Sequence, residues 1–132
     1  MPATGNYLLD KGYDADEALT IYRAVKAGAA DESVQAVDTD GEGGMGIAQF
    51  GVTAAEILKG KGASVRIMGA SEWEAGAIIS RGDPVTVDSV GRCKTAVFGD
   101  AIWGSADQDA SGAGVRIRVT LSDVKVLYET FS

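Results

Sequence analysis

Apolar and polar residues alternate with a period of two in many parts of this chain, which is the pattern of β-strands buried on one face. The alternation is clearest over residues 115–121. The apolar face of that segment consists of Val115, Ile117, Val119 and Leu121. Shorter stretches with the same period predict strands over residues 33–37, 62–68 and 71–79. The pattern therefore predicts an all-β domain.

The middle of the chain predicts a β-hairpin. An apolar run ends at Ile79, and residues 81–84 form a turn in which glycine allows a positive φ and proline fixes φ. Residues 85–87 are β-branched throughout. Residues 88–91 form a second turn, after which residues 92–97 return antiparallel to the strand before them.

Residues 14–30 are open to two interpretations, because a helix capped by Asp16 and a strand with a period of two both fit them. The β-branched residues Thr20 and Ile21, and the small residues after them, favour the strand. Residues 38–44 are rich in Asp and Gly and predict a turn.

One short helical turn interrupts the expected strands. Thr53, with Glu56 three residues later, forms a capping-box pattern, and Gly60 ends the turn. Residues 45–50 before it and residues 101–106 later in the chain are both expected to be strands.

Two parts of the chain have similar sequences. Gly46 is followed by the triplet Val-Arg-Ile at 65–67, and Gly104 is followed by the same triplet at 115–117. The glycines are 58 residues apart and the triplets 50. A duplication predicts two related lobes that together close one barrel or sandwich. Recurrence by composition alone is the alternative.

The first residues follow neither a helical nor a strand period. Tyr7, Leu8, Leu9 and Tyr13 are the anchors of either an arm that grips a partner or a terminus that covers the domain's own core. We therefore divide the chain into residues 1–18 (arm or first strand), 19–121 (barrel or sandwich) and 122–132 (last strand or arm). The expected fold is a small β-barrel or β-sandwich with short helical turns and extended termini.

The composition excludes several partners. Twelve Lys and Arg against nineteen Asp and Glu give a net charge of −7, which repels phosphate, and the basic residues form no block, so we expect no nucleic acid. The start lacks the features of a signal peptide, and no apolar run approaches the length of a membrane span. With a single cysteine we expect assembly in the cytoplasm.

The absence of histidine removes most catalytic chemistry. Ser-His-Asp and Cys-His systems and Cys/His zinc sites cannot be built. The acidic residues of 38–42 suggest a calcium loop, but the twelfth loop position, Gln49 or Gly51, offers no carboxylate. We therefore expect no catalytic residue, no cofactor and no metal. Cys93 is expected to be an inert thiol.

Trp73 and Trp103 each lie on a predicted strand. As structural residues they belong to the core or its rim; as functional residues they anchor a subunit contact or stack on a sugar ring.

The order of these motifs resembles one family, the bacteriophage capsid cement (head decoration) proteins, over about residues 19–121. The segments that carry the resemblance are 21–25, 46–48, 62–67, 75–79, 82–85 (Gly-Asp-Pro-Val), 88–92 (Asp-x-x-Gly-Arg), 102–106 and 114–121. The excursion 50–62 is longer than the family pattern, and the residues after 122 lie outside it.

The resemblance implies a virion structural protein. It would bind the outer surface of an assembled phage capsid, with the major capsid protein lattice as its partner, often as a homotrimer, and would stabilise the head against internal pressure. Two other hypotheses stay open. One is a small-molecule or carbohydrate-binding β-barrel that uses Trp73 or Trp103. The other is a hydrolase that uses paired carboxylates.

Overall fold

The computed structural model describes the backbone of residues 8–127 and the side chains up to residue 122, and the fold is almost entirely β. The all-β prediction is confirmed. The elements are β1 (Leu9–Ala15), β2 (Ala24–Ala27), β3 (Ser33–Ala36), β4 (Gly46–Ala48), α1 (Ala54–Leu58), β5 (Ala63–Glu74), β6 (Pro84–Val87), β7 (Cys93–Thr95), β8 (Ala101–Ala106) and β9 (Arg116–Leu127).

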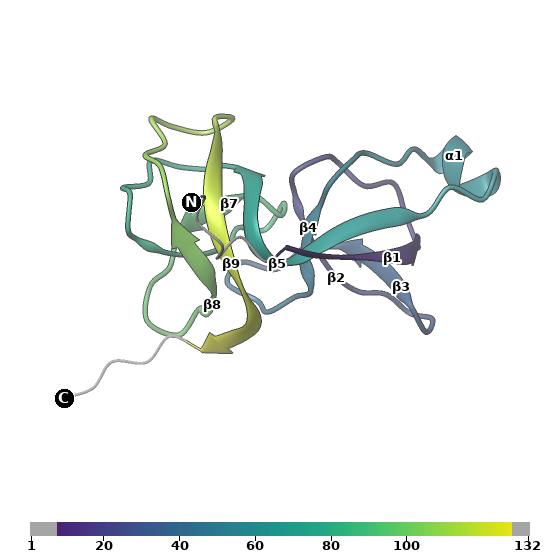
Figure 1. The fold of residues 1–132 in the computed structure, drawn as a ribbon, viewed down its shortest axis with the longest axis horizontal. Coiled ribbons are helices and arrows are strands. Elements are labelled where there is room, and N and C mark those ends of the chain that lie inside the picture. Colours follow the sequence, from purple (N-terminus) through teal and green to yellow (C-terminus); the bar gives the residue numbers. More distant parts are fainter. Residues whose placement is uncertain (1–7, 128–132) are drawn as a thin grey trace, which may run out of the picture.

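The strands form two small barrels that share β5 (Figure 1). In barrel 1 the order is β1-β3-β2-β4-β5, and β5 pairs back with β1 to close the ring. In barrel 2 the order is β5-β9-β8-β6-β7, and the bridge between Ala75 and Cys93 closes it. The prediction that two lobes together close one barrel is therefore wrong, because each lobe closes its own.

The shared strand replaces two that the sequence predicted. Residues 62–68 and 71–79 were expected to be separate strands, but β5 runs unbroken from Ala63 to Glu74. Gly69 lies in its middle with φ of 93°. Because glycine adopts positive φ without strain, the strand changes direction there and continues from one barrel into the next.

The ambiguous segment 14–30 is neither a helix nor one strand. Asp14 and Ala15 end β1, Leu19 forms an isolated bridge with Val52, Tyr22 takes a turn conformation with φ of 58°, and the chain enters the sheet again at β2. The described part of residues 1–18 includes β1, which is a paired strand. The sequence analysis placed a boundary between the domain and a C-terminal strand or arm at residue 122, but that position lies inside β9.

The two barrels are copies of one another in backbone and in core. Leu19 bridges Val52 in barrel 1, and Ile79 bridges Ala110 at the corresponding place in barrel 2. Every residue of the smaller core has a buried counterpart in the larger one. The pairs are Ala15 with Ala75, Leu19 with Ile79, Val25 with Val85, Val34 with Cys93, Ala48 with Ala106, Val52 with Ala110, Ala63 with Ile117, and Val65 with Val119.

The repeated glycines are equivalent, but the repeated triplets are not. A Cβ on Gly46 would collide with the carbonyl oxygen of Arg66, and one on Gly104 with that of Thr120, so both glycines permit the same close approach of two strands. Ala48 pairs with Val65, and Ala106 pairs with Val119. The counterpart of Val65 is thus Val119, and the triplet at 115–117 recurs by composition.

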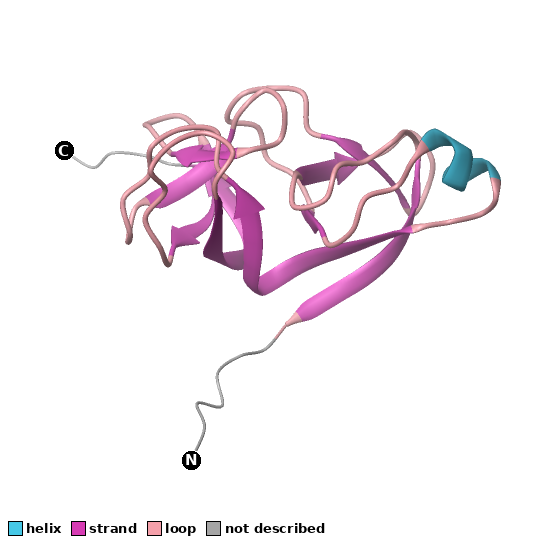
Figure 2. Cartoon of the chain, turned by 90° about the horizontal axis from the view of Figure 1, so that it is seen from above, coloured by secondary structure: helices cyan, strands magenta, loops and turns pink. Residues whose placement is uncertain are grey.

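Two further predictions are settled by burial and capping. Ile117, Val119 and Leu121 are buried as expected, whereas Val115 lies just before β9 and is 36% exposed. The capping box is confirmed, because Thr53 Oγ1 accepts from the Glu56 N–H and the Thr53 N–H donates to Glu56 Oε1. None of the residues of α1 is buried, and the helix projects from the end of barrel 1 (Figure 2).

Candidate functional site

The two tryptophans lie in the core and not on the surface. Both are 0% exposed, and their ring centroids are 5.5 Å apart at an angle of 46°. The Trp73 Nε1–H donates to the Gly91 carbonyl at 2.9 Å, and the Trp103 Nε1–H to the Glu42 carbonyl at 2.9 Å. Their expected role as partner anchors is therefore not available in this fold, and they act as core aromatics whose polar atoms are satisfied.

Two of the apolar residues that sequence analysis selected, Leu8 and Leu9, are exposed at the point where β1 begins. Leu8 is 49% exposed and Leu9 is 39% exposed, while Tyr13 is half-buried against the core of barrel 1. Tyr7 lies outside the described residues. Leu9 pairs with Met68, which is half-buried on β5. Leu8, Leu9 and Met68 are called the central patch below.

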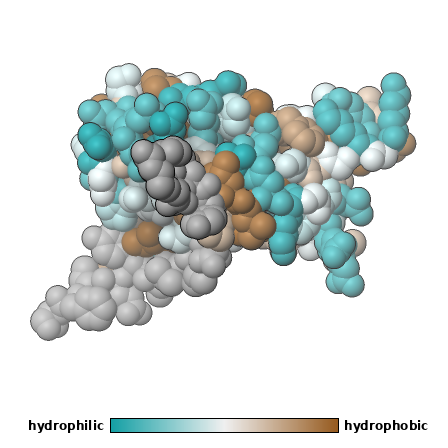
Figure 3. Space-filling view, in the orientation of Figure 1, coloured by the Kyte–Doolittle hydropathy of each residue, from teal (hydrophilic) through white to brown (hydrophobic). Residues whose placement is uncertain are grey.

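The central patch lies where β5 passes from one barrel to the other. Apolar atoms gather at this level in the middle of the face shown in Figure 3, between two more hydrophilic ends. Arg66 limits the patch on one side, since its guanidinium pairs with Asp10 at 2.7 Å, which raises the pKa of Arg66. A small apolar surface with a charged rim is the usual form of a protein contact.

A shallow hollow of ≈ 270 Å³ lies at the far end of barrel 1. Its lining residues are Gly12, Tyr13, Asp14, Glu32, Gly62 and Ala63. Tyr13 is the one aromatic residue among them. The carbohydrate-binding hypothesis relied on Trp73 or Trp103, and neither reaches this hollow or any other part of the surface. Neither tryptophan can therefore stack on a sugar ring, as the carbohydrate-binding hypothesis requires.

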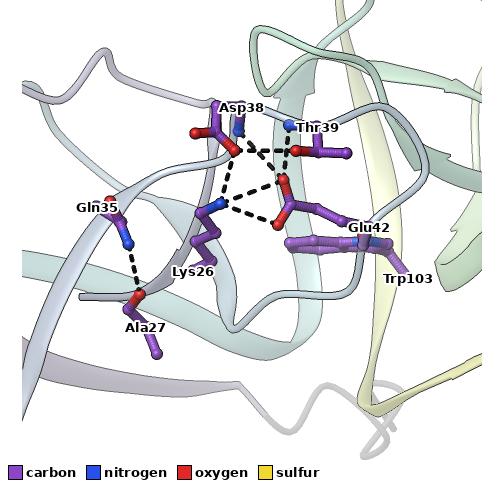
Figure 4. A network of polar contacts seen from close by, with 7 residues as sticks. All are labelled: Lys26, Ala27, Gln35, Asp38, Thr39, Glu42 and Trp103. Carbon is purple, nitrogen blue, oxygen red and sulfur yellow. Dashed lines mark hydrogen bonds and ion pairs between the residues drawn. The ribbon is translucent and has the colours of Figure 1, made fainter. Parts of the chain in front are cut away.

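The acidic turn 38–42 is part of an ion-pair network (Figure 4). Lys26 Nζ lies 2.6 Å from Asp38 Oδ1 and 3.1 Å from Glu42 Oε1. The hydrogen bond from Lys26 lowers the pKa of Asp38, and the bonds to both carboxylates raise the pKa of Lys26. Within the described residues no group of acidic or cysteine side chains is arranged to hold a metal ion. The turn is a structural element.

Six basic side chains of the described residues form ion pairs with acidic neighbours. The ion-paired residues are Arg23, Lys26, Lys61, Arg66, Arg92 and Lys94. These residues are distributed over both barrels, so no basic surface that could track a phosphate backbone is formed by them. In residues 8–127 no helix has the length and apolar character needed to cross a membrane.

Cys93 is buried on β7, inside barrel 2. Burial raises the pKa of its thiol, and the nearby Asp88 carboxylate adds to the rise. The thiol therefore stays protonated and unreactive, and it fills the position that Val34 occupies in barrel 1.

Comparison with known proteins decides the family. The family model described as phage cement protein matches residues 7–121. The chain belongs to the phage cement protein family. The match includes Tyr7 and β1, which the sequence resemblance over 19–121 left out. A search of curated proteins found no match.

One solved structure supports the fold of this cement protein. It is the crystal structure of the head fiber gp8.5 N base in bacteriophage phi29, which is similar with a TM-score of 0.64 and 20% identity. The similarity covers 91% of this chain and 98% of that chain. Family and fold together identify a virion structural protein.

Proposed function

We propose that this cement protein binds the outer surface of an assembled phage capsid and stabilises it against internal pressure. The observation that carries the proposal is the family match over residues 7–121, which takes in both barrels. The partner is the lattice of the major capsid protein. No step in this role requires catalysis or a cofactor, and assembly takes place in the host cytoplasm.

The stabilisation has a simple thermodynamic basis. A protein that binds only the assembled lattice lowers the free energy of that state, so internal pressure must break its contacts before the capsid subunits separate. A homotrimer would make several such contacts at once. Avidity then allows each contact to be small, about 800 Å² or less.

The central patch is the proposed contact with the capsid. Leu9 is the first residue of β1 and Leu8 directly precedes it, so both exposed side chains are held next to a strand that is hydrogen-bonded into barrel 1. Residues 1–7 continue directly from it and include Tyr7, the remaining anchor that sequence analysis selected.

Cosedimentation with purified expanded heads that lack the protein tests the proposal. We expect saturable binding and a higher temperature of head disruption. Failure of the wild-type protein to bind any head lattice would refute the function. The double variant Leu8→Asp/Leu9→Asp is expected to bind at least tenfold more weakly, because it places two charges in an apolar contact.

A leucine elsewhere on the surface provides the matched control. Leu58 is 89% exposed at the end of α1, far from the central patch, and Leu58→Asp is expected to bind heads like the wild type. Loss of binding in Leu58→Asp with normal binding in the double variant would move the contact to the end of barrel 1 while leaving the function in place.

A further inference from the structure

The hollow at the far end of barrel 1 has a structural counterpart on barrel 2. β1 pairs with β5 in the same register in which β5 pairs with β9, so Tyr13 takes the place of Trp73. The bridges that close the two barrels are equivalent as well. Three residues that line the hollow have these counterparts on barrel 2: Asp14 has Glu74, Glu32 has Gly91, and Gly62 has Arg116. We call Glu74, Gly91 and Arg116 the receiving site.

The receiving site holds side chains of a turn that belongs to barrel 1, residues 20–24. The Arg116 guanidinium lies 4.9 Å from the centre of the Tyr22 ring, and this ring packs against the core of barrel 2. Arg23, the next residue of the turn, forms two hydrogen bonds with the Glu74 carboxylate, at 3.3 and 3.2 Å. The occupant of the receiving site is therefore an aromatic residue followed by a basic one.

Backbone hydrogen bonds attach the same turn to the receiving site. The Glu74 N–H donates to the Tyr22 carbonyl at 3.0 Å, and the Ala24 N–H donates to the Gly91 carbonyl at 2.8 Å. Each residue of the receiving site thus contacts the turn. Its counterparts on barrel 1 all line the hollow, so the hollow is the second copy of a site that binds a turn.

The hollow has no such occupant among the described residues. The Asp14 N–H, which corresponds to the donor on Glu74, donates instead to the Glu32 carbonyl at 2.9 Å and closes the ring of strands directly. A carbonyl oxygen has two lone pairs, so the Glu32 carbonyl can accept a second N–H, as the Gly91 carbonyl does. The side chains at the hollow decide what it can bind.

The hollow is more acidic than the receiving site. Asp14 keeps the carboxylate of Glu74, while Glu32 adds a second carboxylate where barrel 2 has a glycine. Gly62 stands where barrel 2 has an arginine. Both carboxylates are exposed, and neither forms an ion pair with another residue of the described chain. The charge complement of this surface is a cation.

The backbone at Glu32 is suited to glycine. Glu32 has φ of 58°, and Gly91 at the same position of barrel 2 has φ of 83°. Only glycine adopts such a conformation without strain. The Glu32 carboxylate forms no hydrogen bond with another described side chain that would offset this cost. The fold therefore gives no reason for a glutamate here, whereas binding of a cation does.

The corresponding turn of barrel 2 does not suit the hollow. Its residues 80–83 place Gly82 where barrel 1 has Tyr22, and Asp83 where barrel 1 has Arg23. Such a turn offers no ring, and its acid would face the carboxylate of Asp14. The chemistry of the hollow thus calls for a turn from a different protein.

We propose that the hollow binds an exposed turn of another protein, in which an aromatic residue is followed by an arginine or a lysine. The ring lies at Tyr13, as the Tyr22 ring lies against barrel 2, and the cation pairs with Asp14 and Glu32. This binding goes beyond the proposed function and needs no capsid, so each of the two can fail while the other holds.

Amide NMR spectra of the full chain, recorded during titration with a cyclic peptide, test the proposal. The peptide contains Thr-Ile-Tyr-Arg-Ala, the sequence of residues 20–24, and cyclisation holds it in a turn. We expect saturable shifts of the Gly12 and Gly62 signals and no shift of Gly91, whose site is occupied within the chain. Peptides with alanine in place of tyrosine, or glutamate in place of arginine, are expected to give no saturable shift.

A double variant tests the role of the two carboxylates. Asp14→Asn/Glu32→Gly is expected to bind the peptide roughly tenfold more weakly, because two groups that face the cation are lost. Its urea midpoint should not fall below that of the wild type, since glycine fits the backbone at residue 32. Asp31 is exposed next to Glu32 but does not line the hollow, and the matched control Asp31→Asn is expected to bind like the wild type.

Three results would overturn the proposal. The first is the absence of any saturable shift in the wild-type protein. The second is equal affinity of the double variant and the wild type, which would place the peptide elsewhere on the surface. The third is a change in the mass of the free protein in solution on introducing the double variant, because a second copy of the chain would then occupy the hollow.

Discussion

Replacing Gly104 with alanine tests the close approach of β8 and β9. The new Cβ would collide with the backbone carbonyl of Thr120, which cannot rotate away as the end of a flexible side chain does. The strands must separate, at a cost of about 1–3 kcal/mol for overpacking and about 0.5–1.5 kcal/mol for a weakened hydrogen bond. Alanine also reduces the conformational entropy of the unfolded chain, and this offsets about 0.4–1 kcal/mol of the destabilisation. The free energy of unfolding should fall by about 2–3 kcal/mol.

Urea unfolding followed by tryptophan fluorescence measures this change, because Trp73 and Trp103 both lie in the core of barrel 2. Gly112 provides the control: it has no positive φ, and a Cβ there would meet nothing within 4 Å. Gly112→Ala should therefore be neutral or slightly stabilising. Equal stability of Gly104→Ala and Gly112→Ala would refute the described contact between β8 and β9.

Three further predictions concern single side chains. Cys93 should react with a thiol reagent only at the rate of unfolding, because its raised pKa and its burial protect it; rapid reaction of the native protein would contradict this. Thr53→Ala should increase hydrogen exchange within α1 and leave the global free energy of unfolding unchanged, since α1 buries no residue. The pKa of Asp38 is lowered in the fold, so its stabilising effect is present above the unfolded pKa of about 4 and is lost as pH falls through the folded value. The urea midpoint of Asp38→Asn should accordingly depend less on pH below about 4 than that of the wild type.

Local chemistry was enough to predict the elements whose signals lie within a few residues. The β6–β7 hairpin follows from the turn around Pro84 and the β-branched residues after it. The capping box at Thr53 and Glu56 predicts α1 to within one residue. The equivalence of Gly46 and Gly104 was also correct, because each is held to glycine by the same steric contact.

The remaining features depend on contacts between distant residues. Continuity of β5 requires β1 as partner on one half and β9 on the other, which no local pattern reveals. The alignment of the triplet at 115–117 with the triplet at 65–67 was wrong, because three residues carry too little information to align the two copies. The burial of Trp73 and Trp103 depends on Gly91 and Glu42, which supply carbonyls to the indole N–H groups from other parts of the chain.

The shared β5 bears on how the molecule would carry load. Domains joined by a linker can be pulled apart by separating their surfaces, which involves only non-covalent contacts. Here one unbroken backbone crosses from the first ring of strands to the second. Tension applied between the two barrels would therefore pass along the covalent bonds of β5, without first opening a surface between the barrels.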